Sequence, residues 1–234
     1  MDWQRPPRPT ELAETRLIEA VLSGHFPIGA SLPPERDLAL QLGVTRPTLR
    51  EALQRMARDG WVEIRHGRPT RVRDYWHEGS LGVLAGIARH RDHLPPHFVP
   101  DLLHVRLALA PAYTRLAVAR TAAQVVEVLE PYASLPDSPD ALAQADWDLH
   151  RFLAIASGNP VFTLILNGFG DLYLTLARRY FATPKARRHS AAFYRDLLRA
   201  ARAGNADEAE AIARRVMSES LELWQRLEAR AQDR

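Results

Sequence analysis

Residues 33–72 are the stretch that most constrains the fold of this chain, because they contain two short amphipathic helical patterns separated by a short turn that begins with a glycine. The first pattern follows Pro33 and Pro34 and has two acidic residues in its first turn, and both features favour a helix start. Gly43 then supplies the tight turn between the two helices. This arrangement predicts a helix-turn-helix motif.

The second helical pattern starts after Thr45, which is a suitable N-cap residue. Its apolar residues recur at the spacing of one buried helix face, at Leu49, Ala52, Leu53 and Met56. Arg46 and Arg50 lie one turn apart outside that face. Arginine pairs with guanine edges in the major groove, and hydroxyl groups bind phosphate oxygens. We therefore predict a DNA recognition helix, with contacts from Arg36, Thr45, Arg46, Thr48 and Arg50.

A β-hairpin is predicted directly after the recognition helix. Residues 61–65 and 69–73 alternate apolar and polar side chains, as short strands do. His66 and Gly67 lie at the predicted tip, from which we expect them to enter the minor groove of DNA. The segment 46–73 carries eight arginines and three acidic residues. A small helical domain with a merely solvated arginine face would explain this charge, but not the turn, the cap and the hairpin.

The remainder of the chain predicts a second, helical domain. Of the 234 residues, 46% are apolar, which is enough for two hydrophobic cores. Helical patterns follow one another at 80–90, 96–119, 122–134, 138–157, 160–182, 185–203 and 206–230. Pro100 and Pro111 are expected to break or kink the second of these helices. We predict a mainly α-helical protein, with a winged helix-turn-helix domain at 1–74, a linker at 75–80 and an all-α helical bundle at 81–234.

Composition excludes several classes of function. The chain has no cysteine, which excludes disulfides, thiolate catalysis and cysteine-ligated zinc sites. No apolar run approaches the roughly 20 residues that span a bilayer, and the first ten residues lack the apolar core of a signal peptide. Phosphate-binding P-loops and Gly-x-Ser-x-Gly motifs are absent from the sequence. We expect a cytoplasmic protein that is not an enzyme, needs no cofactor and does not bind membranes.

Residues 26–72 resemble the winged-helix DNA-binding domain of the GntR family of transcription factors. Downstream segments resemble the acyl-CoA-responsive members of that family, which regulate fatty-acid metabolism; they lie at 102–106 (LLHVR), 156–173, 178–187 and 219–224 (ES-x3-W). The resemblance implies a homodimer that binds a pseudo-palindromic operator in double-stranded DNA. It further implies repression of fatty-acid degradation genes and activation of unsaturated fatty-acid synthesis, with release of the DNA when long-chain acyl-CoA binds.

The resemblance also implies a ligand site inside the helical bundle. Long-chain acyl-CoA would lie among an arginine, several hydroxyl groups and a tryptophan, with its acyl chain along apolar helix faces. The residues at the matching positions are Arg106, Asp146, Tyr173, Tyr180, Tyr194, Glu219, Ser220 and Trp224. Taken singly, each aromatic residue is equally explained as part of the core with its polar tip hydrogen-bonded. Met217 stands where the family has a glycine, and it is expected to narrow the channel mouth and weaken CoA binding.

Two alternatives remain open. Asp146 and His150 are one helical turn apart, and in wider relatives such a pair joins two histidines to hold a metal. Those two positions correspond here to Tyr194 and to 217–218, which are poor substitutes for imidazole, so we predict no metal and a buried Asp–His hydrogen bond. The first alternative is accordingly a GntR-family regulator that responds to a small metal-chelated carboxylate. The second, an enzyme or acyl-CoA carrier, lacks a nucleophile–base constellation and leaves the DNA-reading residues unexplained.

Overall fold

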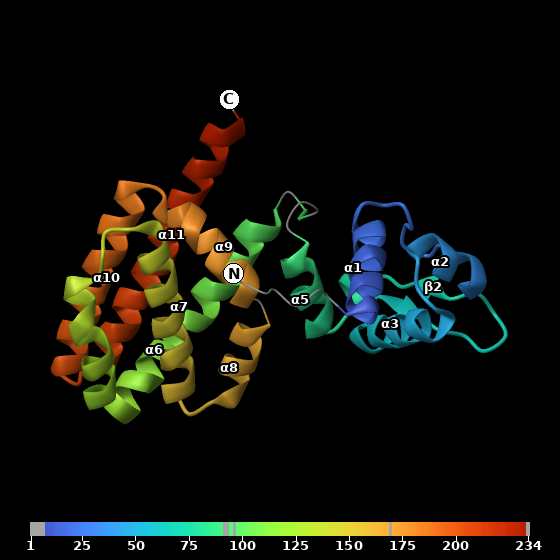
Figure 1. Cartoon of the computed structure of the whole chain (residues 1–234). Coiled ribbons are helices and arrows are strands. Elements are labelled where there is room, and N and C mark those ends of the chain that lie inside the picture. The colour runs from blue at the N-terminus through green and yellow to red at the C-terminus, as the bar shows by residue number, and fades with distance from the viewer. Residues whose placement is uncertain (1–7, 91–93, 96, 169, 233–234) are drawn as a thin grey trace, which may run out of the picture. The chain divides into compact units, whose positions relative to one another are not determined.

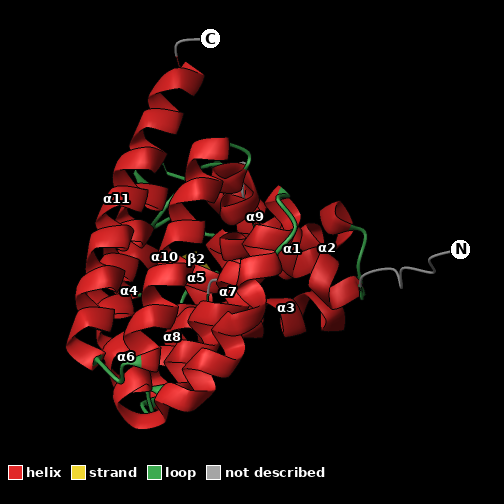
Figure 2. Cartoon of the chain, turned by 90° about the vertical axis from the view of Figure 1, so that its left-hand side faces the viewer, coloured by secondary structure: helices red, strands yellow, loops and turns green. Residues whose placement is uncertain are grey.

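The computed structural model describes residues 8–90, 94–95, 97–168 and 170–232. They are mainly helical (Figure 2) and divide into two compact units, Met1–Leu94 and Pro95–Arg234. The predicted fold class is therefore confirmed. Within the described part of the chain, no single helix is both long and apolar enough to cross a bilayer, and one bent pair of helices meets that test by length and composition only.

The first unit is a winged helix-turn-helix. In chain order its elements are α1 (Pro9–Leu22), α2 (Glu35–Leu42), α3 (Arg46–Asp59), β1 (Val62–Glu63), β2 (Arg71–Val72), α4 (Tyr75–Glu78) and α5 (Leu81–Arg89), labelled in Figure 1 where there is room. Helix α3 packs against both α1 and α2. The predicted helix-turn-helix is thus present, and α1 supplies the third helix of its core.

The local chemistry of the recognition helix α3 follows the prediction. Gly43 ends α2 with a φ of 68°, a left-handed conformation that suits glycine. The hydroxyl oxygen of Thr45 accepts a hydrogen bond from the backbone N–H of Thr48 at 3.3 Å, which caps the start of α3. The buried residues of α3 are those predicted, namely Leu49, Ala52, Leu53 and Met56.

The hairpin is present but shorter than predicted. Val62 pairs with Val72 and Glu63 pairs with Arg71, so each strand has two residues instead of five. Between them the tip turns at Gly67, whose φ is 69°. An additional isolated bridge joins Arg71 to Ser31.

Helix α5 packs closely on the winged-helix core. A Cβ atom added at Gly86 would lie 2.7 Å from the ring of Trp61, which is itself fully buried. The backbone N–H and the hydroxyl of Ser80 both donate to the carbonyl oxygen of Asp59, at 3.0 and 2.8 Å. The first compact unit therefore extends to Leu94, and the expected linker, residues 75–80, contains α4 and belongs to this unit.

The second unit is a bundle of helices (Figure 1). It consists of α6 (Phe98–Leu129), the 3₁₀ helix η2 (Glu130–Ser134), α7 (Pro139–Ala156), α8 (Pro160–Asn167), α9 (Gly170–Phe181), α10 (Pro184–Arg202) and α11 (Ala206–Gln232). Helix α11 packs along α6 and α10, while α7 packs against α6, α8 and α9. The core between them includes fully buried Leu149, Phe181 and Phe193.

Two helix predictions in the bundle need correction. The predicted single helix at 160–182 is wrong, because it is divided into α8 and α9 around Gly168 and Gly170, where glycine weakens helix propensity. Pro111 does not break α6. The backbone leaves helical dihedral angles at Thr121 (φ −144°, ψ 46°), between the two helices predicted at 96–119 and 122–134.

Candidate functional site

The winged-helix unit has a groove between its helices and its hairpin. This groove has a volume of about 950 Å³, and its lining includes Arg50 from α3 and His66, Gly67 and Arg68 from the hairpin tip. Arg46 is exposed on the first turn of α3. The residues predicted to read DNA are therefore exposed or half-buried on the helix-turn-helix and the hairpin tip.

Some of the predicted DNA contacts already have partners in the free protein. Arg50 Nε lies 2.6 Å from Glu35 Oε2, and Arg36 Nε lies 3.0 Å from Asp37 Oδ1. Exposed ion pairs of this kind contribute roughly 0–1 kcal/mol, so exchanging them for phosphate contacts costs little. The Thr45 hydroxyl is used as the helix cap, which makes its first role structural.

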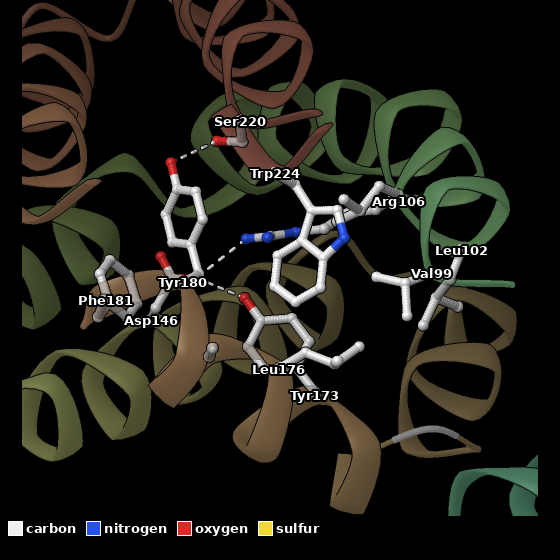
Figure 3. Close-up of a pocket in the computed structure, with 12 residues that line it drawn as sticks. Val99, Leu102, Arg106, Asp146, Tyr173, Leu176, Tyr180, Phe181, Ser220 and Trp224 are labelled. Atoms are coloured by element: carbon white, nitrogen blue, oxygen red, sulfur yellow. Dashed lines mark hydrogen bonds and ion pairs between the residues drawn. The ribbon is translucent and has the colours of Figure 1, made fainter. Parts of the chain in front are cut away.

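The helical bundle has an internal pocket built from four helices (Figure 3). Its lining is mostly apolar and consists of Val99, Leu102, Leu103 and Arg106 from α6, Asp146 from α7, Tyr173, Leu176, Ala177, Tyr180 and Phe181 from α9, and Ser220 and Trp224 from α11. The cavity volume is about 50 Å³. Ligand sites typically measure roughly 300–1,000 Å³, so the pocket is in a closed form.

The Asp146 carboxylate is the polar centre of the pocket. Its Oδ2 lies 3.0 Å from Arg106 Nη2 and accepts a hydrogen bond from the Tyr173 hydroxyl at 2.5 Å. Its Oδ1 accepts from the Tyr194 hydroxyl at 2.9 Å. Burial opposes ionisation of this carboxyl, but Arg106 and the hydrogen bonds keep its pKa below the ordinary value. The pocket therefore encloses a buried arginine–aspartate ion pair.

His150 extends this polar centre into the core. Its Nδ1 lies 2.7 Å from the Tyr113 hydroxyl, and its Nε2 lies 3.9 Å from Asp146 Oδ1, beyond hydrogen-bonding distance. Burial, reinforced by the positive charge of Arg106, lowers the pKa of His150 to about 3, so the ring is neutral. The predicted Asp–His hydrogen bond is therefore wrong, because the Asp146 oxygens are occupied by Arg106 and the tyrosines.

Hydrogen-bond donors remain free in the pocket wall. Arg106 Nε and Trp224 Nε1 are buried and have no hydrogen-bond partner among the described residues. The guanidinium of Arg179 lies over the ring of Trp224, 5.3 Å from the ring centroid. The pocket thus presents N–H donors without matching acceptors, which suits a ligand with carbonyl groups.

Six of the eight predicted ligand residues line the pocket, and two do not. The Tyr194 hydroxyl donates to Asp146 Oδ1, but Tyr194 is not part of the pocket lining. Glu219 contacts His189 of α10 at 2.7 Å. His189 and the apolar residues of the pocket were not predicted from the sequence. Met217 is buried in the bundle and does not line the pocket, so its expected effect on the channel mouth is not supported.

A metal site was the open alternative for this region. Within the described residues, no group of three or more histidine, cysteine, aspartate or glutamate side chains is arranged to hold a metal ion. The neighbours of Asp146 at the metal-site positions are Tyr194 and the neutral ring of His150. Arg106 already provides a positive charge at this carboxylate, so a second cation there would be repelled.

A winged helix-turn-helix with arginines on its recognition helix, followed by a helical bundle with an internal pocket, defines a DNA-binding regulatory protein. Residues 9–72 match the family described as "Bacterial regulatory proteins, gntR family", and residues 73–234 match the FadR C-terminal domain. The chain belongs to the GntR family of transcriptional regulators and carries a FadR C-terminal domain.

Curated relatives agree with this assignment. The chain is 40% identical over 220 residues to the fatty acid metabolism regulator protein of Klebsiella pneumoniae, covering 94% of this chain and 92% of that protein. The protein of the same name from Cronobacter sakazakii is also 40% identical, with the same coverage. Among solved structures, the Listeria monocytogenes regulator Lar, described as controlling expression of the agr system, superposes with a TM-score of 0.61 at 14% identity, covering 95% of this chain and 99% of that one. This last likeness concerns the fold alone.

Proposed function

We propose that the chain is an acyl-CoA-responsive regulator of fatty-acid metabolism genes, in which long-chain acyl-CoA binds the pocket of the helical bundle and releases the winged helix from DNA. The observation that carries the proposal is the mostly apolar pocket around a buried Arg106–Asp146 ion pair with unpartnered N–H donors. The similarity to fatty acid metabolism regulator proteins supports the choice of ligand.

The chemistry of an acyl-CoA fits the two kinds of lining. Apolar residues of α6 and α9 would take the acyl chain, whose burial contributes about 0.8 kcal/mol per methylene. Arg106, Ser220 and Trp224 would donate to the carbonyl groups of the thioester and the pantetheine arm. A free fatty acid lacks the pantetheine carbonyls, and free CoA lacks the chain, so neither should bind as tightly.

Ligand binding requires the pocket to open. The closed cavity of about 50 Å³ cannot hold a long acyl chain. Binding would therefore select a conformation in which the helices around the pocket have moved apart. A coupling free energy of about 1–3 kcal/mol between the ligand site and the DNA site is typical of allosteric proteins and would suffice for a graded response.

We also propose that a homodimer binds a pseudo-palindromic operator, since one recognition helix reads only a half-site and a two-fold dimer doubles the contacts. The DNA contacts would come from the predicted residues of α2, α3 and the hairpin tip. In functional terms, residues 1–74 would bind DNA and residues 81–234 would bind the ligand. Such a regulator acts where the chromosome is, in the cytoplasm.

The proposal is tested by release of the protein from DNA. An operator is first selected from a random duplex library with the full-length protein, and binding is then followed by fluorescence anisotropy. Hexadecanoyl-CoA should release the DNA, whereas hexadecanoate and free CoA at equal concentration should not. If no acyl-CoA of any chain length releases DNA or binds below about 100 µM, roughly 5.5 kcal/mol, the ligand assignment is refuted while the DNA-binding assignment stands.

A further inference from the structure

A second polar cluster adjoins the pocket and is separate from the Asp146 ion pair. The Tyr180 hydroxyl on the pocket wall lies 3.3 Å from Ser220 Oγ and 3.3 Å from His189 Nδ1. The other ring nitrogen of His189, Nε2, lies 2.7 Å from Glu219 Oε2. Four side chains from three helices thus form one hydrogen-bonded chain that ends at a pocket hydroxyl.

Charged groups act on this chain from several helices: in addition to burial, Asp146 raises and Arg106 lowers the pKa of Tyr180. On α11, Arg215 approaches the other Glu219 oxygen, Oε1, at 3.9 Å and also contacts Asp196 of α10 at 3.2 Å. From α9, the group that faces His189 is the Tyr180 hydroxyl. Burial raises the pKa of Tyr180 to about 12, so this phenol keeps its proton at neutral pH.

The protonation state of His189 determines the direction of every hydrogen bond in the chain. An ionised carboxylate only accepts, so His189 Nε2 must carry a hydrogen that it donates to Glu219. In the neutral ring Nδ1 is then an acceptor, and the Tyr180 hydroxyl donates its single hydrogen to Nδ1. In the imidazolium Nδ1–H donates to the Tyr180 oxygen, and the Tyr180 proton is directed to Ser220.

The direction of these hydrogen bonds determines the hydrogen-bonding role of Ser220 in the pocket. When Ser220 accepts from Tyr180, its own hydroxyl hydrogen is free to donate to a ligand. When the Tyr180 proton points at His189, the Ser220 hydroxyl can donate to the Tyr180 oxygen, and a ligand must compete for that hydrogen. A carbonyl oxygen needs a donor, so with a carbonyl-bearing ligand bound the imidazolium form keeps one more hydrogen bond in this chain than the neutral form does.

We propose that His189, held by Glu219, is a positioning residue that makes Ser220 a hydrogen-bond donor to the ligand's carbonyl group, so that ligand binding is coupled to uptake of one proton by His189. This inference rests on the proposed acyl-CoA function and assigns Glu219 a role through His189 instead of a contact with the ligand. Affinity for the ligand then rises as pH falls, because binding takes up a proton.

The test compares wild-type protein with His189→Gln. A glutamine can donate to Glu219 and accept from Tyr180, as the neutral ring does, but it cannot become a cation. The dissociation constant for hexadecanoyl-CoA is measured by calorimetry at about pH 8.0 and about pH 5.5, in buffers of different ionisation enthalpy, which counts the protons taken up. His25→Gln, an exposed histidine of the first unit, is the matched control.

The phosphate groups of CoA also titrate in this range, with a pKa near 6, so the informative quantity is the ratio of the wild-type and variant dissociation constants. We expect the affinity of the wild type to rise relative to that of His189→Gln from the higher to the lower pH, by at most about tenfold per pH unit for one coupled proton. The control should behave as wild type, and Glu219→Gln should lose the coupling as His189→Gln does.

Each other outcome overturns the inference. Equal proton uptake in wild type and His189→Gln would assign the proton to the ligand, and a pH-independent affinity of the wild type would remove the coupling, but both would leave the acyl-CoA function intact. Failure of the wild type to bind hexadecanoyl-CoA at either pH would refute both. Should the variants unfold, ¹⁵N-histidine spectra of the wild type decide, because both ring nitrogens of His189 must be protonated in the complex.

Discussion

Removing the Asp146 carboxylate should destabilise the helical bundle strongly. The side chain is 5% exposed and accepts hydrogen bonds from Arg106, Tyr173 and Tyr194. Asp146→Ala leaves the Arg106 guanidinium buried without a counter-charge, a change that typically costs about 3–5 kcal/mol. For a unit of this size, we expect the melting temperature of the bundle to fall by roughly 10–15 °C.

A second substitution separates the cost of the orphaned charge from the cost of lost packing. Asp146→Ala combined with Arg106→Met removes both charges and replaces the arginine with a side chain of similar reach. Because the buried charge is removed, the double variant should be more stable than Asp146→Ala, although the Tyr173 and Tyr194 hydroxyls, which lose their acceptor, keep it below wild type. Asp148→Ala, an exposed carboxylate on the same helix, is the control and should change stability by less than about 0.5 kcal/mol.

The measurement is differential scanning calorimetry together with urea unfolding followed by circular dichroism. A loss of less than about 1 kcal/mol in the free energy of unfolding of Asp146→Ala would contradict a stabilising role for this carboxylate. A double variant no more stable than the single one would show that the buried charge is not the cause. Both outcomes can be read from the same set of four proteins.

Further predictions concern pH, DNA and packing. Because the folded-state pKa of Asp146 is lowered, its stabilisation is present above its unfolded pKa and lost as pH falls through the folded value; acid unfolding curves of wild type and Asp146→Asn should therefore converge at low pH. Arg46→Ala should weaken operator binding by about 1–3 kcal/mol and relax base preference, whereas Arg58→Ala on the last turn should do neither; an unchanged ratio of operator to random-DNA affinity would exclude Arg46 as a base reader. Gly86→Ala should cost about 1–3 kcal/mol in thermal unfolding, because its Cβ meets the buried ring of Trp61. Sedimentation at micromolar concentration should give a dimer, and a strictly monomeric protein would contradict the operator proposal.

The winged-helix unit could be predicted from sequence because its signals are local. Thr45 caps α3 by accepting from the backbone N–H three residues ahead, Gly43 adopts a left-handed conformation, and the apolar spacing of α3 gives its buried face directly. The bundle was harder to predict. The strong apolar pattern at 160–182 continues across two glycines, and periodicity alone did not reveal that the chain turns there.

The pocket residues also divide into those that could be predicted from sequence and those that could not. Polar residues such as Arg106 and Trp224 were found through family resemblance, whereas the apolar lining is indistinguishable from ordinary core residues in a sequence. The contact made by Glu219 could not be predicted for a related reason. Its neighbour His189 is 30 residues away on another helix, and no local spacing rule connects them.

The close packing of α5 on the winged helix bears on how regulators of this kind could be recombined. A chimera that joins this DNA-reading head to a foreign sensor after Val72, where the match to the GntR family ends, would remove α5 and uncover Trp61, which is now fully buried. Such a fusion would expose a large aromatic surface and invite aggregation. A junction after Leu94 keeps α5 and the Ser80–Asp59 hydrogen bonds with the head. The transferable module is therefore longer than the segment that matches the GntR family.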